Sequence, residues 1–362
     1  MYRAAVMVAP ERPLEIREYA EPEMEPGAIL LQTIYCEVCG TDVHLYHGRL
    51  AGVPYPIIPG HVSVGRIVKV TRDVTGVDGS VLREGDVVTF LDVHETCGQC
   101  WFCLVAKAST RCPSRRVYGI TYSAEDGLLG GWSEAIYLKP GVKVIKLPQG
   151  VTPERYIAAG CGLPTAIHAL ERAEVRLGDS VVIQGCGPVG LNAAILAQLS
   201  GATQIIVVGA PQARLDMARA IGADQTIDIE RYGAEERIAR VRELTTGRGA
   251  DVSIEATGNP AAIPEGMRMT RDNGRYVVAG QYTDAGSVEI NPHWHINRKH
   301  LEIRGCWGTD FSHLYRGIKV LAKHGEKFPY EGFITRVYRL EEMSEALADV
   351  ERLQVVKAVV QP

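Results

Sequence analysis

The sequence predicts an α/β protein of two domains, a strand-rich first part followed by a doubly wound parallel sheet. Its 362 residues suit two domains at about 150 residues each. Short apolar runs broken by proline, glycine and aspartate fill residues 1–150, a pattern typical of a barrel or sandwich. From residue 179 onward, apolar runs alternate with helical patterns, as in successive βαβ units.

Composition excludes several classes of function. Apolar residues make up 46% and charged residues 23%, which suits a buried core and not a disordered chain. The net charge of −4 argues against a nucleic-acid partner, which needs a concentrated positive surface. No apolar run is long enough to span a membrane, so we expect no membrane partner. The charged N-terminal stretch lacks a signal core, so we expect a cytoplasmic protein whose nine cysteines are thiols or metal ligands.

The first part is predicted to be mainly β-structure. Each short apolar run lies between residues that favour turns and is predicted to form one strand. The clearest runs are Ala28–Ile34, Gly65–Val70 and Val87–Leu91. A single helix is predicted after them, over Pro153–Leu170, because apolar residues recur there at helical spacing.

The second part is predicted to alternate strands and helices. The buried strand Val181–Ile183 precedes the helix Leu191–Leu199, and the strand Gln204–Val208 precedes the helix Arg214–Ile221. Further strands are predicted at Gln225–Ile227, Val252–Glu255, Arg275–Val278, Glu302–Arg304 and, near the C-terminus, Val355–Val360. This alternation is what a parallel sheet with helices on its faces requires.

A glycine-rich turn joins the first strand and the first helix of this second part. The run from Gly185 to Gly190 has the pattern G-x-G-x-x-G. Glycines let the backbone approach a pyrophosphate, and free N–H groups at the helix start bind the anion. The strand–turn–helix context predicts a dinucleotide cofactor. Its expected contacts are Gly185, Gly187, Pro188, Val189 and Gly190.

The end of the second strand bears on the choice between NAD and NADP. An acidic residue there usually binds the ribose 2′-hydroxyl of NAD, but this strand ends at Gly209 without a carboxylate. The nearest basic residue is Arg214, which can serve either cofactor. Both cofactors remain open from the residues, with NAD slightly favoured.

Four cysteines in one loop predict a structural zinc site. Cys97, Cys100, Cys103 and Cys112 have the spacing C-x2-C-x2-C-x8-C. Four thiolates close a tetrahedral site with no open position, so the metal holds a loop and does no chemistry. An iron–sulfur cluster is the alternative, but the ferredoxin spacing is not matched.

Scattered residues indicate a second, open metal site. Cys39, His61 and Cys161 offer two thiolates and one imidazole, a zinc set that leaves a fourth position for water or substrate. No spacing rule identifies ligands so far apart. Packing roles for these residues are therefore alternatives, as is Cys36 acting as the ligand in place of Cys39.

These motifs, in this order along essentially the whole chain, are similar to those of the zinc-dependent medium-chain alcohol dehydrogenase family. The resemblance implies a GroES-like β-barrel catalytic domain at residues 1–163, with the structural zinc loop at about residues 92–113. It implies a Rossmann domain at residues 164–305 and a C-terminal return to the catalytic domain at residues 306–362. It also implies two zinc ions per chain, a nicotinamide cofactor and a homodimer or homotetramer.

The resemblance assigns roles to single residues near the open site. Cys39, His61 and Cys161 match the catalytic zinc ligands, with Cys39 favoured over Cys36. Thr41 matches the hydroxyl of a proton relay, and His44 matches the imidazole that ends the relay.

Other matches concern the surroundings of the metal and the cofactor. Asp42 matches the carboxylate behind the ligand histidine, where such a group orients the imidazole. Thr165 matches a residue beside the nicotinamide, and Lys357 falls where some members place a basic residue on the pyrophosphate. Val62 is a departure, because the family usually has Glu there. Valine makes the surroundings of the zinc less negative and more apolar, so we expect the substrate set to differ.

These roles predict hydride transfer between a small-molecule alcohol or carbonyl compound and the cofactor, with the proton leaving through Thr41, the cofactor ribose and His44 to solvent. The polar stretch Asp92–Glu95 favours a polyol, whereas Val62 favours a cyclic or bulky secondary alcohol. Two further alternatives are a carbonyl reductase working mainly in reverse and a non-catalytic nucleotide-binding protein that keeps only the structural zinc.

Overall fold

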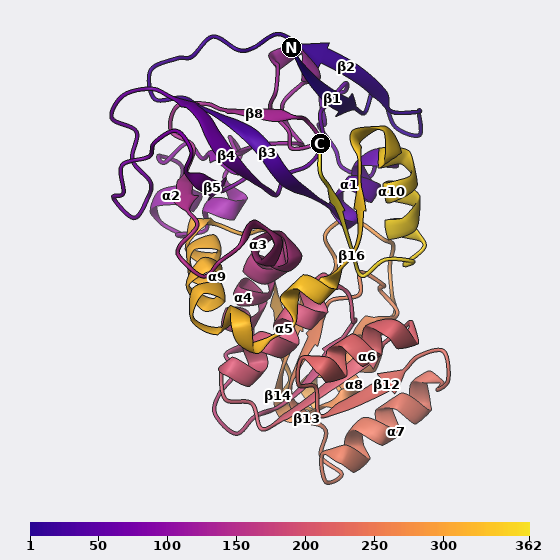
Figure 1. The fold of residues 1–362 in the computed structure, drawn as a ribbon. Helices are drawn as coiled ribbons and strands as arrows, with labels where there is room; N and C mark the ends of the chain where they lie inside the picture. The colour runs from indigo at the N-terminus through magenta and orange to yellow at the C-terminus, as the bar shows by residue number, and fades with distance from the viewer. The chain divides into compact units, whose positions relative to one another are not determined.

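The computed structural model describes all 362 residues and divides the chain into two compact units (Figure 1). The first unit consists of Met1–Gly160 and Asp310–Pro362, so the C-terminal segment returns to the N-terminal part. The second unit is the continuous segment Cys161–Thr309. No helix has both the length and the apolar character needed to cross a membrane.

The first unit is built on a seven-stranded sheet. The strand order is β16 (Ile334–Tyr338), β17 (Lys357–Val360), β3 (Ile29–Val38), β4 (Ser63–Val70), β5 (Val87–Phe90) and β9 (Val144–Lys146), with β8 (Ala135–Leu138) also paired to β3. Its pairings are antiparallel except between β16 and β17. Strand β17 is buried along its whole length, so the last strand of the chain completes the core around β3.

Smaller elements surround this sheet. Two short ribbons pair β1 (Tyr2–Val6) with β2 (Glu15–Tyr19), and β6 (Val93–Glu95) with β7 (Arg116–Val117). The helices are α1 (Gly40–Tyr46), α2 (Trp101–Leu104), α3 (Pro153–Ala159), α9 (Phe311–His324) and α10 (Met343–Glu351). Helix α1 begins directly after β3, so the sheet fixes the start of the helix that carries the predicted relay residues.

The second unit contains the predicted parallel sheet of six strands. Its order is β12 (Gln225–Asp228), β11 (Gln204–Gly209), β10 (Ser180–Gln184), β13 (Ala250–Glu255), β14 (Thr270–Val278) and β15 (Glu302–Gly305). Every neighbouring pair is parallel. The strand order reverses between β10 and β13, and ligands of such sheets bind beyond the carboxyl ends of the strands at this point.

Helices cover this sheet and explain the apolar strands. They are α4 (Gly162–Ala173), α5 (Pro188–Leu199), α6 (Gln212–Ala220), α7 (Ala234–Leu244) and α8 (Ala262–Met269). A core cluster joins Val182 and Ile206 of the sheet to Ile238 and Val241 of α7. Because helices cover the sheet, its inner strands are buried along most of their length, as a doubly wound sheet requires.

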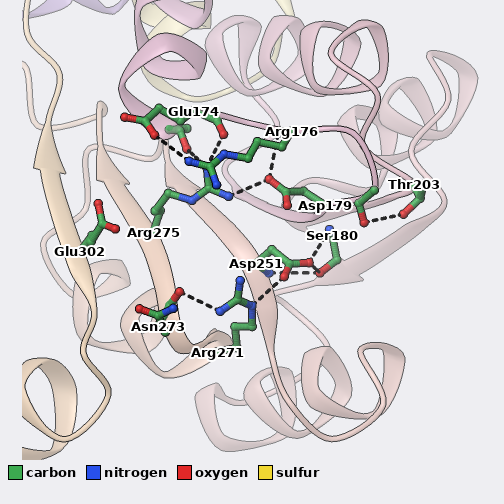
Figure 2. Close-up of polar contacts among 12 residues, drawn as sticks. Glu174, Arg176, Asp179, Ser180, Thr203, Asp251, Arg271, Asn273, Arg275 and Glu302 are labelled. Carbon is green, nitrogen blue, oxygen red and sulfur yellow. Dashed lines mark hydrogen bonds and ion pairs between the residues drawn. The ribbon is translucent and has the colours of Figure 1, made fainter.

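Hydrogen bonds and ion pairs connect the elements at the amino-terminal edge of the sheet, which lies opposite the carboxyl edge (Figure 2). Arg275 donates to the carbonyl of Ala173 at the end of α4 and pairs with Asp179 at 2.8 Å. Asp251 accepts from the backbone N–H of Ser180 at 2.8 Å and from the Arg271 Nε at 2.6 Å. These ion pairs occupy the edge where strands begin and leave the carboxyl edge for a ligand.

One predicted element is wrong in an informative way. The helix expected over Pro153–Leu170 is two helices, α3 and α4, separated at Gly160 and Cys161. Gly160 has φ +50°, and an added Cβ would lie 2.1 Å from a carboxylate oxygen of Glu37. Helical spacing continues across this break, so the apolar pattern alone does not reveal it. The other predicted strands and helices in the second unit are found with ends shifted by a few residues.

Candidate metal centres and cofactor site

The four loop cysteines converge on one point. The sulfur atoms of Cys97, Cys100, Cys103 and Cys112 all lie within 4.8 Å of one another. Sγ–Sγ distances are 3.6 Å for Cys100 with Cys103 and for Cys112 with Cys97. A tetrahedral zinc site with metal–sulfur bonds of about 2.3 Å places its sulfurs about 3.8 Å apart, so this donor set fits a closed zinc site.

The surroundings of these thiols also suit a cation. The backbone N–H of Cys97 donates to the sulfur of Cys112 at 3.2 Å, and that of Cys100 donates to Cys97 at 3.3 Å. Hydrogen bonds from Gln99 and Cys100 lower the pKa of Cys97 to about 6, whereas burial and the neighbouring Cys100 raise the pKa of Cys103 to about 11. Helix α2 in this loop has no buried residue, so the loop has little apolar packing of its own.

The open metal site is assembled from residues that lie far apart in the sequence. Cys39, His61 and Cys161 place their ligand atoms within 4.8 Å of one another. Cys39 immediately precedes α1, and His61 stands just before β4 and is 9% exposed. Cys161 is the first residue of the second unit. It directly follows Gly160, the residue that ends α3. Two sulfurs and one ring nitrogen match a catalytic zinc set with one position left open.

Close backbone packing fixes the position of His61. Gly60 has φ +91°, and an added Cβ would lie 2.6 Å from both the sulfur of Cys36 and the ring of Trp132. Cys36 therefore packs beneath the loop, and the ligand group contains Cys39 instead of Cys36. Burial raises the pKa of the Cys36 thiol well above its ordinary value, which suits a packing role.

Helix α1 brings the predicted relay residues and a carboxylate to the same turn. Asp42 is fully buried, and its carboxylate accepts the backbone N–H of Cys39 at 2.9 Å. Burial raises the pKa of Asp42, while the nearby His61 acts to lower it. Thr41 and His44 lie on the same short helix and are partly exposed. Burial, followed by repulsion from Arg49 and His47, lowers the pKa of His44, which keeps its imidazole neutral near pH 7.

The glycine turn has the backbone geometry that a dinucleotide needs. Gly185 has φ +108°, and an added Cβ would lie 2.6 Å from the carbonyl oxygen of Ala256. At Gly190 an added Cβ would lie 1.9 Å from the Gly185 carbonyl oxygen. Helix α5 begins at Pro188 with Gly187 as its N-cap, so free N–H groups of its first turn are available to a pyrophosphate.

The second strand ends beside this turn. An added Cβ at Gly209 would lie 2.5 Å from the sulfur of Cys186, and that sulfur donates to the Ala210 carbonyl at 3.2 Å. Arg214 on α6 is buried, and its guanidinium lies 3.8 Å from where a Gly187 Cβ would be. Burial lowers the pKa of Arg214. The glycine turn, the end of β11 and Arg214 thus lie together at the carboxyl edge of the sheet.

Two carboxylates at this edge were not identified from the sequence. Asp228 ends β12 in register with Gly209 and is buried, so a carboxylate borders the second strand from its neighbour. Glu255 ends β13, is fully buried, and accepts from the backbone N–H groups of Thr257, Gly258 and Gly280. The buried run that precedes Glu255 was an available signal, whereas β12 is exposed at its first residue and half-buried at its second, so no such run precedes Asp228.

Lys357, which the resemblance places at the pyrophosphate, lies in a buried ion pair. Its ammonium pairs with Glu37 at 2.6 Å, and the two side chains are 0% and 1% exposed. Glu37 also donates its backbone N–H to the carbonyl of Val62 at 3.0 Å. Because its charge is buried and paired, Lys357 is not assigned to the pyrophosphate.

The structure also shows the surroundings of Thr165, of His94 in the polar stretch Asp92–Glu95, and of the segment His293–Asn297. Thr165 lies on α4 and is partly exposed. The imidazole of His94 bonds the Tyr122 hydroxyl at 2.6 Å and the Pro140 carbonyl at 3.1 Å, so it stabilises a loop. The segment His293–Asn297 forms a single π-helical turn with an exposed Trp294 and joins neither metal group.

Two family descriptions match the chain. Residues 25–149 match the alcohol dehydrogenase GroES-like domain, and residues 188–323 match the zinc-binding dehydrogenase domain. These matches agree with the strand-rich first unit and the doubly wound second unit.

Known proteins resemble the chain over its whole length. It is 35% identical to 5-exo-hydroxycamphor dehydrogenase of Pseudomonas putida, over 99% of this chain and 98% of that protein. It is 31% identical to D-arabinitol dehydrogenase 1 of Uromyces fabae, over 94% and 92%. A crystal structure of an alcohol dehydrogenase from Thermotoga maritima aligns with TM-score 0.94 and 33% identity, over 100% of this chain and 99% of that one.

Proposed function

The chain belongs to the zinc-dependent medium-chain alcohol dehydrogenase family, and from this premise we propose that Cys39, His61 and Cys161 hold its catalytic zinc ion. The protein is an enzyme, an oxidoreductase that transfers a hydride between an alcohol and a nicotinamide cofactor. One observation supports the site above all others. Three ligand side chains from distant segments lie within 4.8 Å of one another.

Residues of α1 are proposed to move the proton that the reaction releases. Zinc supplies a positive charge that lowers the pKa of a nearby hydroxyl group. The Thr41 hydroxyl accepts the proton of the alcohol while donating its own, and the proton passes toward His44. Because burial lowers the pKa of His44, its imidazole is neutral near pH 7 and can act as the proton acceptor. Asp42 holds the start of the helix through the Cys39 N–H and balances charge near His61.

We assign the four loop cysteines to a second, structural zinc ion, which makes two zinc ions per chain. The closed set of four sulfurs and its N–H···S bonds support this role. The exposed helix α2 supports it as well, because a loop with little apolar packing needs another source of stability.

The cofactor is proposed to be NAD, bound at the carboxyl edge of the six-stranded sheet. Its pyrophosphate would meet the start of α5, and its nicotinamide would lie near Thr165. The residues assigned to the pyrophosphate turn are Gly185, Gly187, Pro188, Val189 and Gly190. Gly209 and Arg214 are assigned to the surroundings of the adenosine ribose. Asp228 beside Gly209 favours a ribose hydroxyl and disfavours a 2′-phosphate by charge repulsion.

The substrate is proposed to be a secondary alcohol, cyclic alcohols before polyols. The relative at 35% identity is named for a hydroxylated cyclic terpenoid, and relatives at 31% are named for arabinitol and for erythritol and threitol. Val62, in place of an acidic residue, makes the surroundings of the ligand His61 more apolar and favours the cyclic class. Oxidation is the proposed direction, with carbonyl reduction as the reverse reaction of the same site.

Domain roles, assembly and compartment complete the proposal. We assign catalysis to residues 1–163 with the return segment 306–362, and cofactor binding to residues 164–305; the match of residues 25–149 to the GroES-like domain and the return of Asp310–Pro362 to the first unit support this assignment. We propose a homodimer or homotetramer, the common assemblies of soluble enzymes. We propose the cytoplasm, because none of the nine cysteines forms a disulfide and thiols persist in reducing compartments.

Metal analysis tests the catalytic site directly. The purified protein should contain two zinc ions per chain, Cys39→Ser should contain one, and this variant should have no detectable turnover. Cys36→Ser is the matched control, because it removes a neighbouring cysteine outside the ligand group, and it should keep both ions. Turnover by Cys39→Ser with one zinc absent would refute the proposed site.

A substrate panel tests the reaction class and the cofactor. Cyclic secondary alcohols, polyols, simple alcohols and the matching carbonyl compounds would each be tried with NAD(H) and NADP(H), with absorbance of the reduced nicotinamide as the readout. Turnover of alcohols with NAD is expected. One zinc per chain and no activity on any compound would instead favour a nucleotide-binding protein that keeps only the structural metal.

A further inference from the structure

A buried ion pair lies behind the proposed catalytic metal site. The Glu37 carboxylate and the Lys357 ammonium are 2.6 Å apart, and their side chains are 1% and 0% exposed. Glu37 lies near the end of β3, two residues before the ligand Cys39, and Lys357 begins β17, which pairs with β3. The pair therefore belongs to the core of the first unit and not to its surface.

This pair reaches the backbone beside each of the three ligands. An added Cβ on Gly160 would lie 2.1 Å from a carboxylate oxygen of Glu37 and 2.2 Å from the ammonium nitrogen of Lys357, and Gly160 immediately precedes the ligand Cys161. The backbone N–H of Glu37 donates to the carbonyl of Val62 at 3.0 Å, and Val62 follows the ligand His61. Cys39 stands two residues beyond Glu37 in the chain.

Stability alone does not account for two charges at this place. Replacing a buried ion pair with apolar side chains of similar size is often neutral or stabilising for a fold. A charged pair differs from an apolar one because its hydrogen-bonded geometry is directional. Here the direction matters, since the α3–α4 break at Gly160 is pressed against both charged groups and determines where the next residue, Cys161, points.

We propose that Glu37 and Lys357 are positioning residues for the metal site: their ion pair seats the Gly160–Cys161 peptide and sets Cys161 relative to Cys39 and His61. The proposal rests on the proposed zinc site at these three ligands. Neither residue touches the substrate or the metal in this role. Groups that orient metal ligands in this way typically change metal affinity or activity by about 10- to 100-fold when replaced.

The test uses a double variant, Glu37→Leu with Lys357→Met, which replaces the pair by apolar side chains and leaves no unpaired charge. The matched control, Glu265→Leu with Arg237→Met, removes a partly buried pair at 2.6 Å in the second unit. Both proteins are loaded with Co²⁺ in place of zinc. The readouts are the thiolate–cobalt absorption, the rate of metal release to a chelator, and kcat and KM with the alcohol found by the panel.

The double variant is expected to keep the metal of the four-cysteine site and to lose the other metal about 10- to 100-fold faster than wild type. Its cobalt band at the catalytic site should shift, and kcat should fall while the KM for NAD stays unchanged. The control should match wild type in all of these. A double variant with wild-type release rate and cobalt band would overturn the proposal.

A second variant keeps the test decisive if the double variant does not fold. Glu37→Asp retains the charge but withdraws the carboxylate from Gly160 by one methylene, so faster metal release and a shifted band are expected. Wild-type values for Glu37→Asp would then overturn the proposal. A failure of the zinc site itself looks different: wild type would bind one cobalt per chain, and Cys39→Ser would leave the spectrum unchanged.

Discussion

At the residue scale, His44 shows how a local environment suits a residue to one task. An ordinary histidine titrates at about 6.5, but burial, followed by repulsion from Arg49 and His47, lowers the pKa of His44. In the mechanism that we propose, a neutral imidazole in the last turn of α1 accepts the proton that Thr41 would release. The acidic limb of the turnover–pH profile should therefore lie below pH 6.5.

Replacing this imidazole should slow turnover in a pH-dependent way. We expect His44→Asn to reduce kcat on the order of 10²-fold near neutral pH, with a smaller deficit in alkaline buffer, where hydroxide can take the proton. Added imidazole should restore part of the rate. His293→Asn, an exposed histidine in the second unit, serves as control. A uniform loss across the pH range would argue against a proton-transfer role.

A single carboxylate is also expected to set the cofactor preference. Asp228 lies beside Gly209 at the end of the neighbouring strand, where its charge would face a 2′-phosphate. Asp228→Asn should improve kcat/KM for NADP relative to NAD by about tenfold, which corresponds to about 1.4 kcal/mol. Asp216→Asn, an exposed carboxylate on α6, should leave this ratio unchanged. An unchanged ratio in Asp228→Asn would place the determinant elsewhere.

At the scale of elements, the four-cysteine loop and the sheets obtain stability from different sources. Strand β10 is buried except at its first residue, whereas α2 in the loop has no buried residue. The zinc ion that we propose for the loop would offer it what apolar burial offers the sheet, because binding energy at a structural site is folding energy.

Removing one loop ligand should therefore open the loop locally. Cys97→Ser is expected to lose one zinc ion, to unfold roughly 5 °C lower than wild type, and to become sensitive to proteases between residues 97 and 112. The rest of the chain should stay folded, so far-ultraviolet circular dichroism should change little. The control is Cys306→Ser, which alters a buried cysteine outside both metal groups. Resistance to proteolysis in Cys97→Ser would show that the loop holds itself together.

At the scale of the whole molecule, carboxylates paired in the folded state govern the response to acid. Burial raises the pKa of Asp251, but hydrogen bonds from Ser180 and the Arg271 guanidinium outweigh this effect and lower it to about 2 (Figure 2). Glu134 behaves alike, because its bonds to Arg3 outweigh burial and lower its pKa. A carboxyl group with a lowered folded-state pKa stabilises the fold above its unfolded-state pKa of about 4 and loses that contribution as pH falls.

The protein should accordingly lose stability as the pH falls from about 4 toward 2. Asp251→Asn should be less stable than wild type by about 1–2 kcal/mol at pH 5, allowing for solvent screening of this partly exposed group, and the gap should narrow toward pH 2. Thermal unfolding between pH 5 and pH 2 measures it, with the exposed Asp284→Asn as control. If the difference in stability between Asp251→Asn and wild type does not change with pH, the Asp251 carboxylate does not contribute to the loss of stability in acid.

Local sequence patterns were enough to predict much of the molecule. The alternation of apolar runs predicted the parallel sheet, because a strand buried on both faces must be apolar throughout. The spacing of Cys97, Cys100, Cys103 and Cys112 predicted a closed ligand set, because residues so near in sequence can reach one ion. The run from Gly185 to Gly190 predicted a dinucleotide turn, because only glycine allows the backbone approaches found there.

Long-range contacts decided the rest. Gly160, Gly162 and Pro164 are local signals of a helix break, but the groups packed against Gly160, Glu37 and Lys357, come from distant strands. The resemblance placed Lys357 at the cofactor, and a lysine near the C-terminus has no local feature that reveals its buried partner Glu37. Cys39, His61 and Cys161 likewise form one ligand set only after the chain has folded, since sequence periodicity describes neighbours along the chain and a metal ion joins neighbours in space.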